Sequence, residues 1–227
     1  MKFIIAIVIS LLAAAISYIS LDKSSAERIK WFAVADEEAE YTSKNIPQTR
    51  IIMVAAILAI MAFLSTLQIM AKVNTPNGIM KMTLALLCMI GAGVFDYREY
   101  RIPNVFPLVM AVGAVILLVA GLLSGMDGAV AYITTSVVAA IACALILIAA
   151  SALTKQGIGA GDIKLISALA LLTGVYSVIG TLFFGVVACT IYAVVALIMK
   201  KKTTSSSVPF GPFLLLGYII TLFTISF

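Results

Sequence analysis

The sequence has 227 residues, of which 63% are hydrophobic and 11% charged, and its mean hydropathy is +1.18. A water-soluble domain of this size does not tolerate such a composition, so the chain is predicted to fold with a lipid bilayer as its solvent. The net charge of +5 lies in short clusters of Lys and Arg between apolar runs, which indicates topology determinants and contacts with membrane lipid and argues against nucleic-acid binding.

Eight apolar runs predict an all-α fold, that of a polytopic membrane protein with about eight transmembrane helices, because roughly 20 apolar residues span the hydrocarbon core. The runs cover residues 3–21, 51–71, 79–95, 104–123, 129–153, 163–175, 177–199 and 209–227. The first run is long for the apolar region of a secretory signal and has no clear cleavage site, so it is interpreted as a retained helix.

The distribution of basic residues predicts the orientation. Residues 22–50 form the only long polar stretch and are interpreted as an amphipathic or partly ordered loop. With the N-terminus outside, the cytoplasmic loops hold twelve of the fifteen Lys and Arg residues, as the positive-inside rule requires. The prediction is a multi-pass protein of the plasma (inner) membrane with both termini outside.

The sixth run, residues 163–175, is short for a transmembrane helix. Its 13 residues extend about 20 Å, against roughly 30 Å of hydrocarbon. One explanation is a locally thin membrane. The other is that the glycine-rich stretch 157–161 enters the membrane as non-helical backbone beside a wet cavity, which would carry Asp162 below the surface.

Two aspartates stand at boundaries of apolar runs. Asp96 ends a run in GVFDYREYRIPN, and Asp162 begins one in KQGIGAGDIKL. Two predicted spans separate them, so both are expected on the cytoplasmic face, whereas Asp127 is expected outside. Ionisable groups at such positions are costly and tend to mark functional sites.

A pair of neighbouring carboxylates would suit aspartic proteolysis. One member keeps a proton while the other activates water, and the glycines Gly159 and Gly161 would let a substrate backbone approach. We expect Asp162 to be the more desolvated member and to hold the shared proton. The chain has no histidine, which excludes Ser-His and HExxH mechanisms, and its three cysteines lie singly, so no metal and no cofactor is expected.

Each aspartate also has a local structural interpretation. Asp162 stands where a carboxylate would cap a helix, and Asp96 could form an ion pair with Arg98 or Arg101. Neither interpretation explains why both aspartates share a face and why one of them follows a GxGxG run.

Two other functions remain open at this stage. A small ion- or proton-coupled membrane transporter could use the same carboxylates, although no internal repeat is found. A serine protease could use Ser151 with Lys155, which are neighbours at i and i+4 on a helix.

Three segments, taken together, resemble a known family. DYREYRIPN, KQGIGAGDIKLISALALLTG and VPFGPFLLLG, in this order and spacing, are similar to the signatures of the type IV prepilin peptidase family, the GxGD aspartic proteases that include preflagellin peptidases. The resemblance covers residues 90 to 227. It implies a six-helix GxGD peptidase core within residues 76–227, preceded by an N-terminal two-helix region, residues 1–75.

The resemblance also implies roles for individual residues. The catalytic pair would be Asp96 and Asp162. Residues that would bind substrate or support the site come from all three segments: Pro103, Asn104, Gly159, Gly161, Lys164, Pro209 and Gly211. Local roles are expected beside these, with Asn104 capping the fourth span and Pro209 and Pro212 starting the last helix.

The partner implied by the resemblance is a prepilin, pseudopilin or preflagellin-like protein, cut on the cytoplasmic side of its hydrophobic segment. Typical bacterial members carry a large cytoplasmic domain with paired CxxC motifs between their first two spans. Residues 22–50 contain no cysteine and are too short for it. Methyltransferase activity is therefore not expected, and the chain resembles the compact, peptidase-only members.

Overall fold

The computed structural model describes residues 2–21, 48–125, 128–153, 158–199 and 208–224, and these residues form helices joined by short connections. The all-α prediction is confirmed, because each predicted apolar run corresponds to one helix. The helices are α1 (Lys2–Leu21), α3 (Gln48–Lys72), α4 (Pro76–Glu99), α5 (Val105–Leu123), α6 (Ala129–Leu153), α7 (Ala160–Thr173), α8 (Val175–Ile198) and α9 (Gly211–Thr224).

Five of these helices are long and apolar enough to cross a membrane: α3 from Arg50, α4, α5, α6 and α8. The apolar stretch Ile4–Ile19 of α1 and the whole of α9 are shorter. Together they make the chain a multi-pass membrane protein. α7 has 14 residues, about 21 Å of helix, and is too short to cross roughly 30 Å of hydrocarbon alone, as the sequence predicted.

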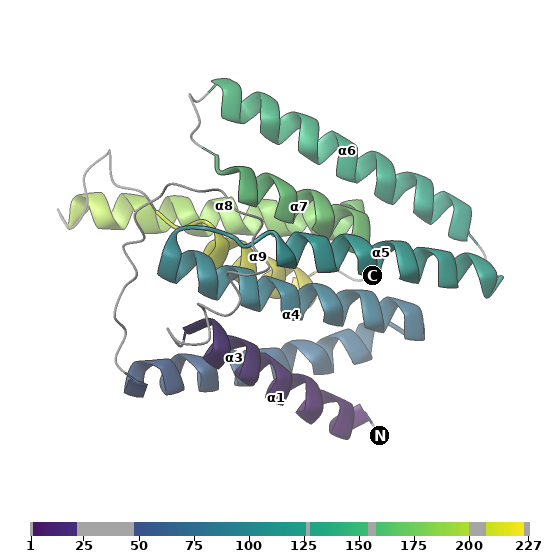
Figure 1. Cartoon of the computed structure of the whole chain (residues 1–227), viewed down its shortest axis with the longest axis horizontal. Coiled ribbons are helices and arrows are strands. Elements are labelled where there is room, and N and C mark those ends of the chain that lie inside the picture. Colours follow the sequence, from purple (N-terminus) through teal and green to yellow (C-terminus); the bar gives the residue numbers. More distant parts are fainter. Residues whose placement is uncertain (1, 22–47, 126–127, 154–157, 200–207, 225–227) are drawn as a thin grey trace.

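Helix α4 is the centre of the bundle. In its most apolar window 72% of the residues are buried, against 11% in α6 and 17% in α8. It packs against α1, α3, α5, α7 and α9, and Figure 1 shows it between the α1 and α3 helices and the α5 and α7 helices. Small residues allow this close packing; a side chain on Gly91, for example, would overlap the ring of Phe106 on α5.

Both ends of α4 have well-defined caps. The Thr75 hydroxyl accepts a hydrogen bond from the Gly78 N–H at 3.3 Å, and Pro76 occupies the first turn, where its missing N–H costs nothing. At the other end Tyr100 adopts a left-handed conformation, with φ of 54°, and its N–H donates to the Asp96 carbonyl. This turn sends the chain back across the end of the bundle, beside Asp96.

Helices α7 and α8 are joined by a single residue, Gly174, whose φ of 86° favours glycine. α7 then packs mainly against α5 and α6, whereas α8 packs mainly against α9. The contact between α8 and α9 is backbone to backbone, because a Cβ on Gly217 would lie 2.6 Å from the Gly185 nitrogen. Such small-residue contacts are how membrane helices associate without a hydrophobic driving force.

The N-terminal helices α1 and α3 pack against each other and against α4. The predicted loop lies almost entirely outside the described residues, apart from its last three, which begin α3. The division of the chain into residues 1–75 and 76–227 stays a prediction.

The α8–α9 contact leads to a stability prediction. Gly217→Ala is expected to lower the free energy of unfolding by about 1–3 kcal/mol, because the added methyl group would overlap the backbone of α8 at Thr181 and Gly185. Thermal unfolding in detergent would measure this. Gly113→Ala is the matched control, since its methyl group meets only the end of the flexible Leu84 side chain. Equal unfolding temperatures for the two variants would contradict the prediction.

Candidate active site

Asp96 is buried near the end of α4, with 6% of its surface exposed. Its Oδ2 accepts a hydrogen bond of 2.7 Å from the backbone N–H of Gly211, the first residue of α9, and the Phe210 N–H also donates to the carboxylate. The first N–H groups of a helix have no partner within the helix, and its N-terminus carries a partial positive charge. Asp96 therefore holds the start of α9, and its carboxylate receives two N–H donors there.

Gly211 fits this contact only because it has no side chain. A Cβ at this position would lie 2.8 Å from the Asp96 Cβ and 3.1 Å from its Oδ2. Pro209, which precedes it, is half-buried, and Pro212 lies in the first turn of α9. The structure thus places the VPFGPF segment against Asp96, and Gly211 supports the site by letting its own N–H reach the carboxylate.

Asp162 lies in the first turn of α7, where it also caps the helix. The backbone N–H of Gly159, the N-cap residue, donates to its carboxylate, which is the reciprocal bond of a capping box. This is the local role that the sequence suggested. It uses only part of the carboxylate, since Asp162 Oδ1 is buried and has no hydrogen-bond partner among the described residues.

The two carboxyl groups are close enough for their charges to interact. Burial and the neighbouring Asp96 charge raise the pKa of Asp162 to about 7, against the smaller opposing effect of the Gly159 N–H. Asp162 belongs to α7, outside the helices long enough to cross the bilayer. The structure therefore places the two aspartates within range of each other's charge.

The expected difference in burial is only partly found. Over the whole residue Asp96 is the more buried and Asp162 is half-buried, but the Oδ1 atom of Asp162 is itself buried, so the expectation that Asp162 is the more desolvated member stays a prediction. The two carboxyl groups also differ in their hydrogen bonds. Asp96 accepts from N–H donors at the start of α9, whereas one oxygen of Asp162 has no donor among the described residues. The environments are unequal, as expected, but the difference comes from donors more than from depth.

The segment between α4 and α5 forms another wall of the site. Gly161 packs against it, since a Cβ there would lie 3.1 Å from the Cβ of Ile102. The Lys164 ammonium donates to the Asn104 side-chain oxygen at 3.1 Å. These contacts join the IPN and GxGDxK segments. Pro103, between Ile102 and Asn104 in the chain, is half-buried.

Asn104 does not cap α5 as expected. It occupies the N-cap position, but its φ of −60° and ψ of −15° are helical and its side chain makes no capping hydrogen bond. The side-chain oxygen accepts from Lys164 instead. A tertiary hydrogen bond to a cation has replaced the local one.

The suggested ion pair of Asp96 also gives way to a different arrangement. The hydrogen bonds described for the Asp96 carboxylate come from Gly211 and Phe210, at the start of a helix far away in the sequence. Arg98 is two residues further along α4, so the two side chains leave the helix in different directions, and Arg98 is 2% exposed.

Of the suggested Ser151 and Lys155 pair, the structure describes only Ser151. The Ser151 hydroxyl donates to the backbone carbonyl of Ile158 at 3.1 Å, and so holds the end of α6 to the start of the glycine-rich segment. Lys155 lies outside the described residues.

One neighbour of the site could not be predicted from the sequence. The charge of Asp162 acts on the thiol of Cys189, a half-exposed residue of α8. Within the sequence Cys189 is one small residue in an apolar run, and only the packing of α8 brings it to the aspartates. No group of three or more His, Cys, Asp or Glu residues in the described part of the chain could hold a metal ion.

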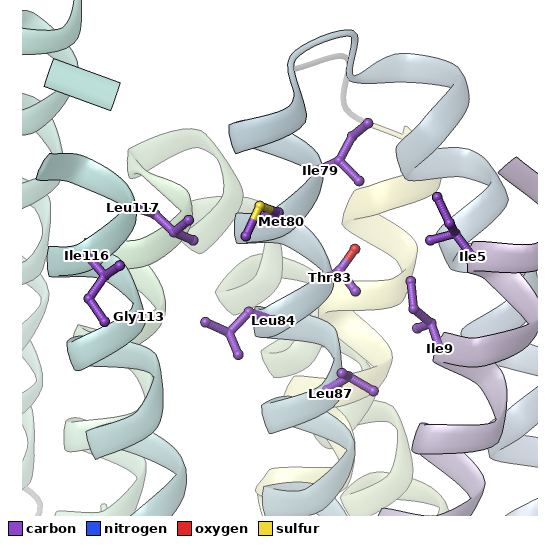
Figure 2. Close-up of a pocket in the computed structure, with 10 residues that line it drawn as sticks. All are labelled: Ile5, Ile9, Ile79, Met80, Thr83, Leu84, Leu87, Gly113, Ile116 and Leu117. Atoms are coloured by element: carbon purple, nitrogen blue, oxygen red, sulfur yellow. The ribbon is translucent and has the colours of Figure 1, made fainter. Parts of the chain in front are cut away.

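An apolar pocket of about 410 Å³ lies elsewhere, between α1, α4 and α5 (Figure 2). On α4 it is lined by residues from Ile79 to Leu87, and Asp96 lies nine residues beyond Leu87, half a turn around the helix. The pocket therefore opens on the side of α4 opposite to Asp96. Its lining residues are Ile5, Ile9, Ile79, Met80, Thr83, Leu84, Leu87, Gly113, Ile116 and Leu117.

Comparison with protein families identifies the enzyme class. Residues 83–194 match the type IV leader peptidase family. The chain belongs to this family. The matched region contains both aspartates and ends before the VPFGPF segment, and no curated protein and no solved structure matched the chain. Membership makes this chain a peptidase of the leader peptidase type, and the family in general implies a prepilin-like substrate.

A stability measurement tests the contact between Asp96 and α9 in this leader peptidase. Asp96→Ala is expected to lower the free energy of unfolding by about 1–3 kcal/mol, because the N–H of Gly211 would be buried without an acceptor. Asp96→Asn keeps an oxygen at the same place and is expected to retain most of the stability. Thermal unfolding of both variants in the same detergent decides the matter, and an alanine variant as stable as the asparagine variant would contradict the described contact.

Proposed function

We propose that this leader peptidase is an aspartic endopeptidase that removes the leader of a prepilin, pseudopilin or preflagellin-like protein, with Asp96 and Asp162 as its catalytic pair. The observation that carries the proposal is the single site in which two interacting carboxyl groups have unequal hydrogen-bond partners. Pairs of acids held in different protonation states are the basis of aspartic proteolysis.

The hydrogen bonds support a division of roles. Asp96 is the ionised member, because N–H groups at the start of α9 stabilise its negative charge. Asp162 is the protonated member, because burial and the Asp96 charge favour its neutral form. The pair shares one proton and titrates as a unit.

The reaction then needs only water and the two acids. Asp96 accepts a proton from water while the water oxygen attacks the scissile carbonyl carbon, and Asp162 donates its proton to the carbonyl oxygen. In the tetrahedral intermediate the C–N bond breaks as Asp96 gives its proton to the leaving nitrogen. Asp162 takes back the hydroxyl proton, so the products are a carboxylic acid and an amine and the pair returns to its starting state.

The supporting residues would keep this geometry. Gly211 permits the N–H contact with Asp96, and Gly161 lets α7 approach Ile102. The Lys164–Asn104 bond connects the two segments beside Asp162. We place the site toward the cytoplasm in the plasma (inner) membrane, since basic residues cluster in the loops at this end of the bundle.

The aspartate variants test the proposal directly. Asp96→Asn and Asp162→Asn are each expected to abolish cleavage of a co-expressed prepilin-like protein, with a loss of at least about a thousandfold, because a proton acceptor or donor is removed. Cleavage is measured as the mobility shift of the substrate, and insertion of each variant is checked in the membrane fraction.

Glu99→Gln is the matched control, since it removes a carboxylate from the same end of α4 that is outside the proposed pair. It is expected to keep activity near that of the unmodified chain. Full cleavage by both asparagine variants would refute the catalytic assignment.

The pH dependence provides a second test. The folded-state pKa of Asp162 is raised to about 7, so its proton is present below this pH and is lost as the pH rises through it. Cleavage is therefore expected to decline on the alkaline side with an apparent pKa near 7, a value that belongs to the pair. Initial rates between pH 5 and 9 in detergent measure it, and a rate that keeps rising to pH 9 would contradict the assignment of Asp162 as the protonated member.

A further inference from the structure

We infer that the apolar pocket between α1, α4 and α5 is a lipid site, which holds one hydrocarbon chain of a membrane lipid from the leaflet farther from the aspartates. The inference does not depend on the proposed function, because the pocket opens on the side of α4 opposite to Asp96. The ligand class is the acyl chain of a phospholipid, held more firmly than the lipid around the rest of the bundle.

The pocket lies between two helices that both rest on α4. α1 and α5 each pack against α4. Figure 2 shows the α1 residues on one side of the α4 residues and the α5 residues on the other. On α1 the pocket is lined by Ile5 and Ile9, and on α5 by Gly113, Ile116 and Leu117. A molecule in the pocket therefore contacts three helices, whereas a lipid on the flank of a single helix contacts one.

The depth of the pocket matches one leaflet. Along α4, which runs from Pro76 to Glu99, the pocket extends from Ile79 near the start to Leu87 near the middle. These eight steps cover about 12 Å of helix, and half of the hydrocarbon core is about 15 Å thick. Asp96 lies near the other end of α4. The pocket thus belongs to the leaflet farther from the aspartates.

The wall of the pocket excludes water. Nine of its ten lining residues bring no side-chain oxygen or nitrogen, and the hydroxyl oxygen of the tenth, Thr83, is buried. A water molecule in a cavity needs about two to four polar partners, and apolar cavities stay dry. Inside the bilayer, hydrocarbon is the fluid that reaches such a wall. An empty pocket would forfeit the dispersion contacts that a chain supplies.

The width of the pocket separates a lipid chain from a protein helix. A volume of about 410 Å³ over about 12 Å of length gives a mean cross-section of about 34 Å², which is a width of about 6 Å. A helix with its side chains is about 10–12 Å in diameter and does not enter a space of this width. A hydrocarbon chain does, because carbon atoms in contact lie only about 3.5–4.0 Å apart.

Packing explains why this chain stays while other lipid exchanges. A lipid chain is surrounded by apolar groups both in the bilayer and in the pocket, so the hydrophobic effect favours neither place. The pocket offers fixed walls on three helices, and its outer residues Met80 and Ile116 are 57% and 60% exposed until something covers them. Many small dispersion contacts with an ordered wall then favour the bound chain.

Photo-cross-linking tests whether a chain is retained. The unmodified full chain is reconstituted in vesicles of phosphatidylethanolamine and phosphatidylglycerol, with a trace of phosphatidylethanolamine that carries a diazirine in one acyl chain. The protein is transferred to detergent, washed free of loosely held lipid and only then irradiated. Peptide mass spectrometry is expected to find lipid adducts on pocket residues and none on outward residues of α6 such as Leu145, which is 62% exposed.

The position of the diazirine tests the leaflet. A diazirine near the ester is expected to label α4 at Ile79 and Met80, close to the membrane surface. A diazirine near the methyl end of the chain is expected to label Leu87, close to the middle of the bilayer. The reverse order would contradict the assigned leaflet.

Two variants fill the pocket from different helices. Ile116→Trp on α5 and Met80→Trp on α4 are each expected to lower the retained adduct about tenfold, because the indole ring takes the place of the chain. Val115→Trp is the matched control, since Val115 is 55% exposed but is not among the residues that line the pocket. It is expected to retain the lipid. Thermal unfolding in the same detergent shows that each variant is folded.

The outcomes are distinguishable. Adducts in the pocket that both filling variants lose and Val115→Trp keeps support the lipid site. The inference is overturned if no adduct survives the wash, if adducts are equally frequent on α6, or if neither filling variant loses them. Light scattering supplies a further check. An unmodified chain that is dimeric, and that Ile116→Trp makes monomeric, would assign the pocket to a second copy and overturn the lipid site.

Discussion

The hydrogen bond between the Gly211 N–H and the Asp96 carboxylate is the contact on which the site depends, and it joins residues 115 positions apart in the sequence. A buried carboxylate needs donors, and the start of a helix offers N–H groups that have no partner. The carboxylate thus gains donors, and the N–H groups at the start of α9 gain an acceptor. The contact requires glycine at position 211, fixes where α9 begins, and aligns Gly217 with Gly185 so that α8 can pack on α9.

The second aspartate is held by a separate set of contacts, which explains how two acids of the same type can differ. Asp162 caps its own helix through Gly159, and Gly161 presses that helix against Ile102. Asp96 faces a helix N-terminus, while one oxygen of Asp162 faces no donor. In the proposed mechanism, this difference in hydrogen bonding separates an ionised acid from a protonated one and provides for hydrolysis without histidine.

The same rule governs polar groups elsewhere in the bundle, since lipid satisfies none of them. Lys81 is buried in α4, where its ammonium lies 3.9 Å from the centre of the Tyr132 ring. The Lys72 ammonium donates to the carbonyls of Leu222 and Phe223 at the end of α9, where a cation is favoured. Contacts of polar side chains thus connect helices of the bundle to one another. At the aspartates, by contrast, one carboxylate oxygen, Asp162 Oδ1, has no hydrogen-bond partner among the described residues.

The class of fold and the helices could be predicted from the sequence, and so could the candidate pair of aspartates. Apolar runs report helices directly, because crossing a bilayer needs a fixed length of apolar chain. Counting spans placed Asp96 and Asp162 on one face, and the GxGD pattern with its two companion segments pointed to the family that the comparison then identified. These inferences use only local composition, order and spacing.

The contacts between distant residues could be found only in the folded chain. Asn104 occupies a capping position yet binds Lys164, and Asp96 accepts hydrogen bonds from the backbone at the start of α9. In each case the partner comes from a distant segment, and the choice depends on how helices pack, which a pattern within one helix does not contain.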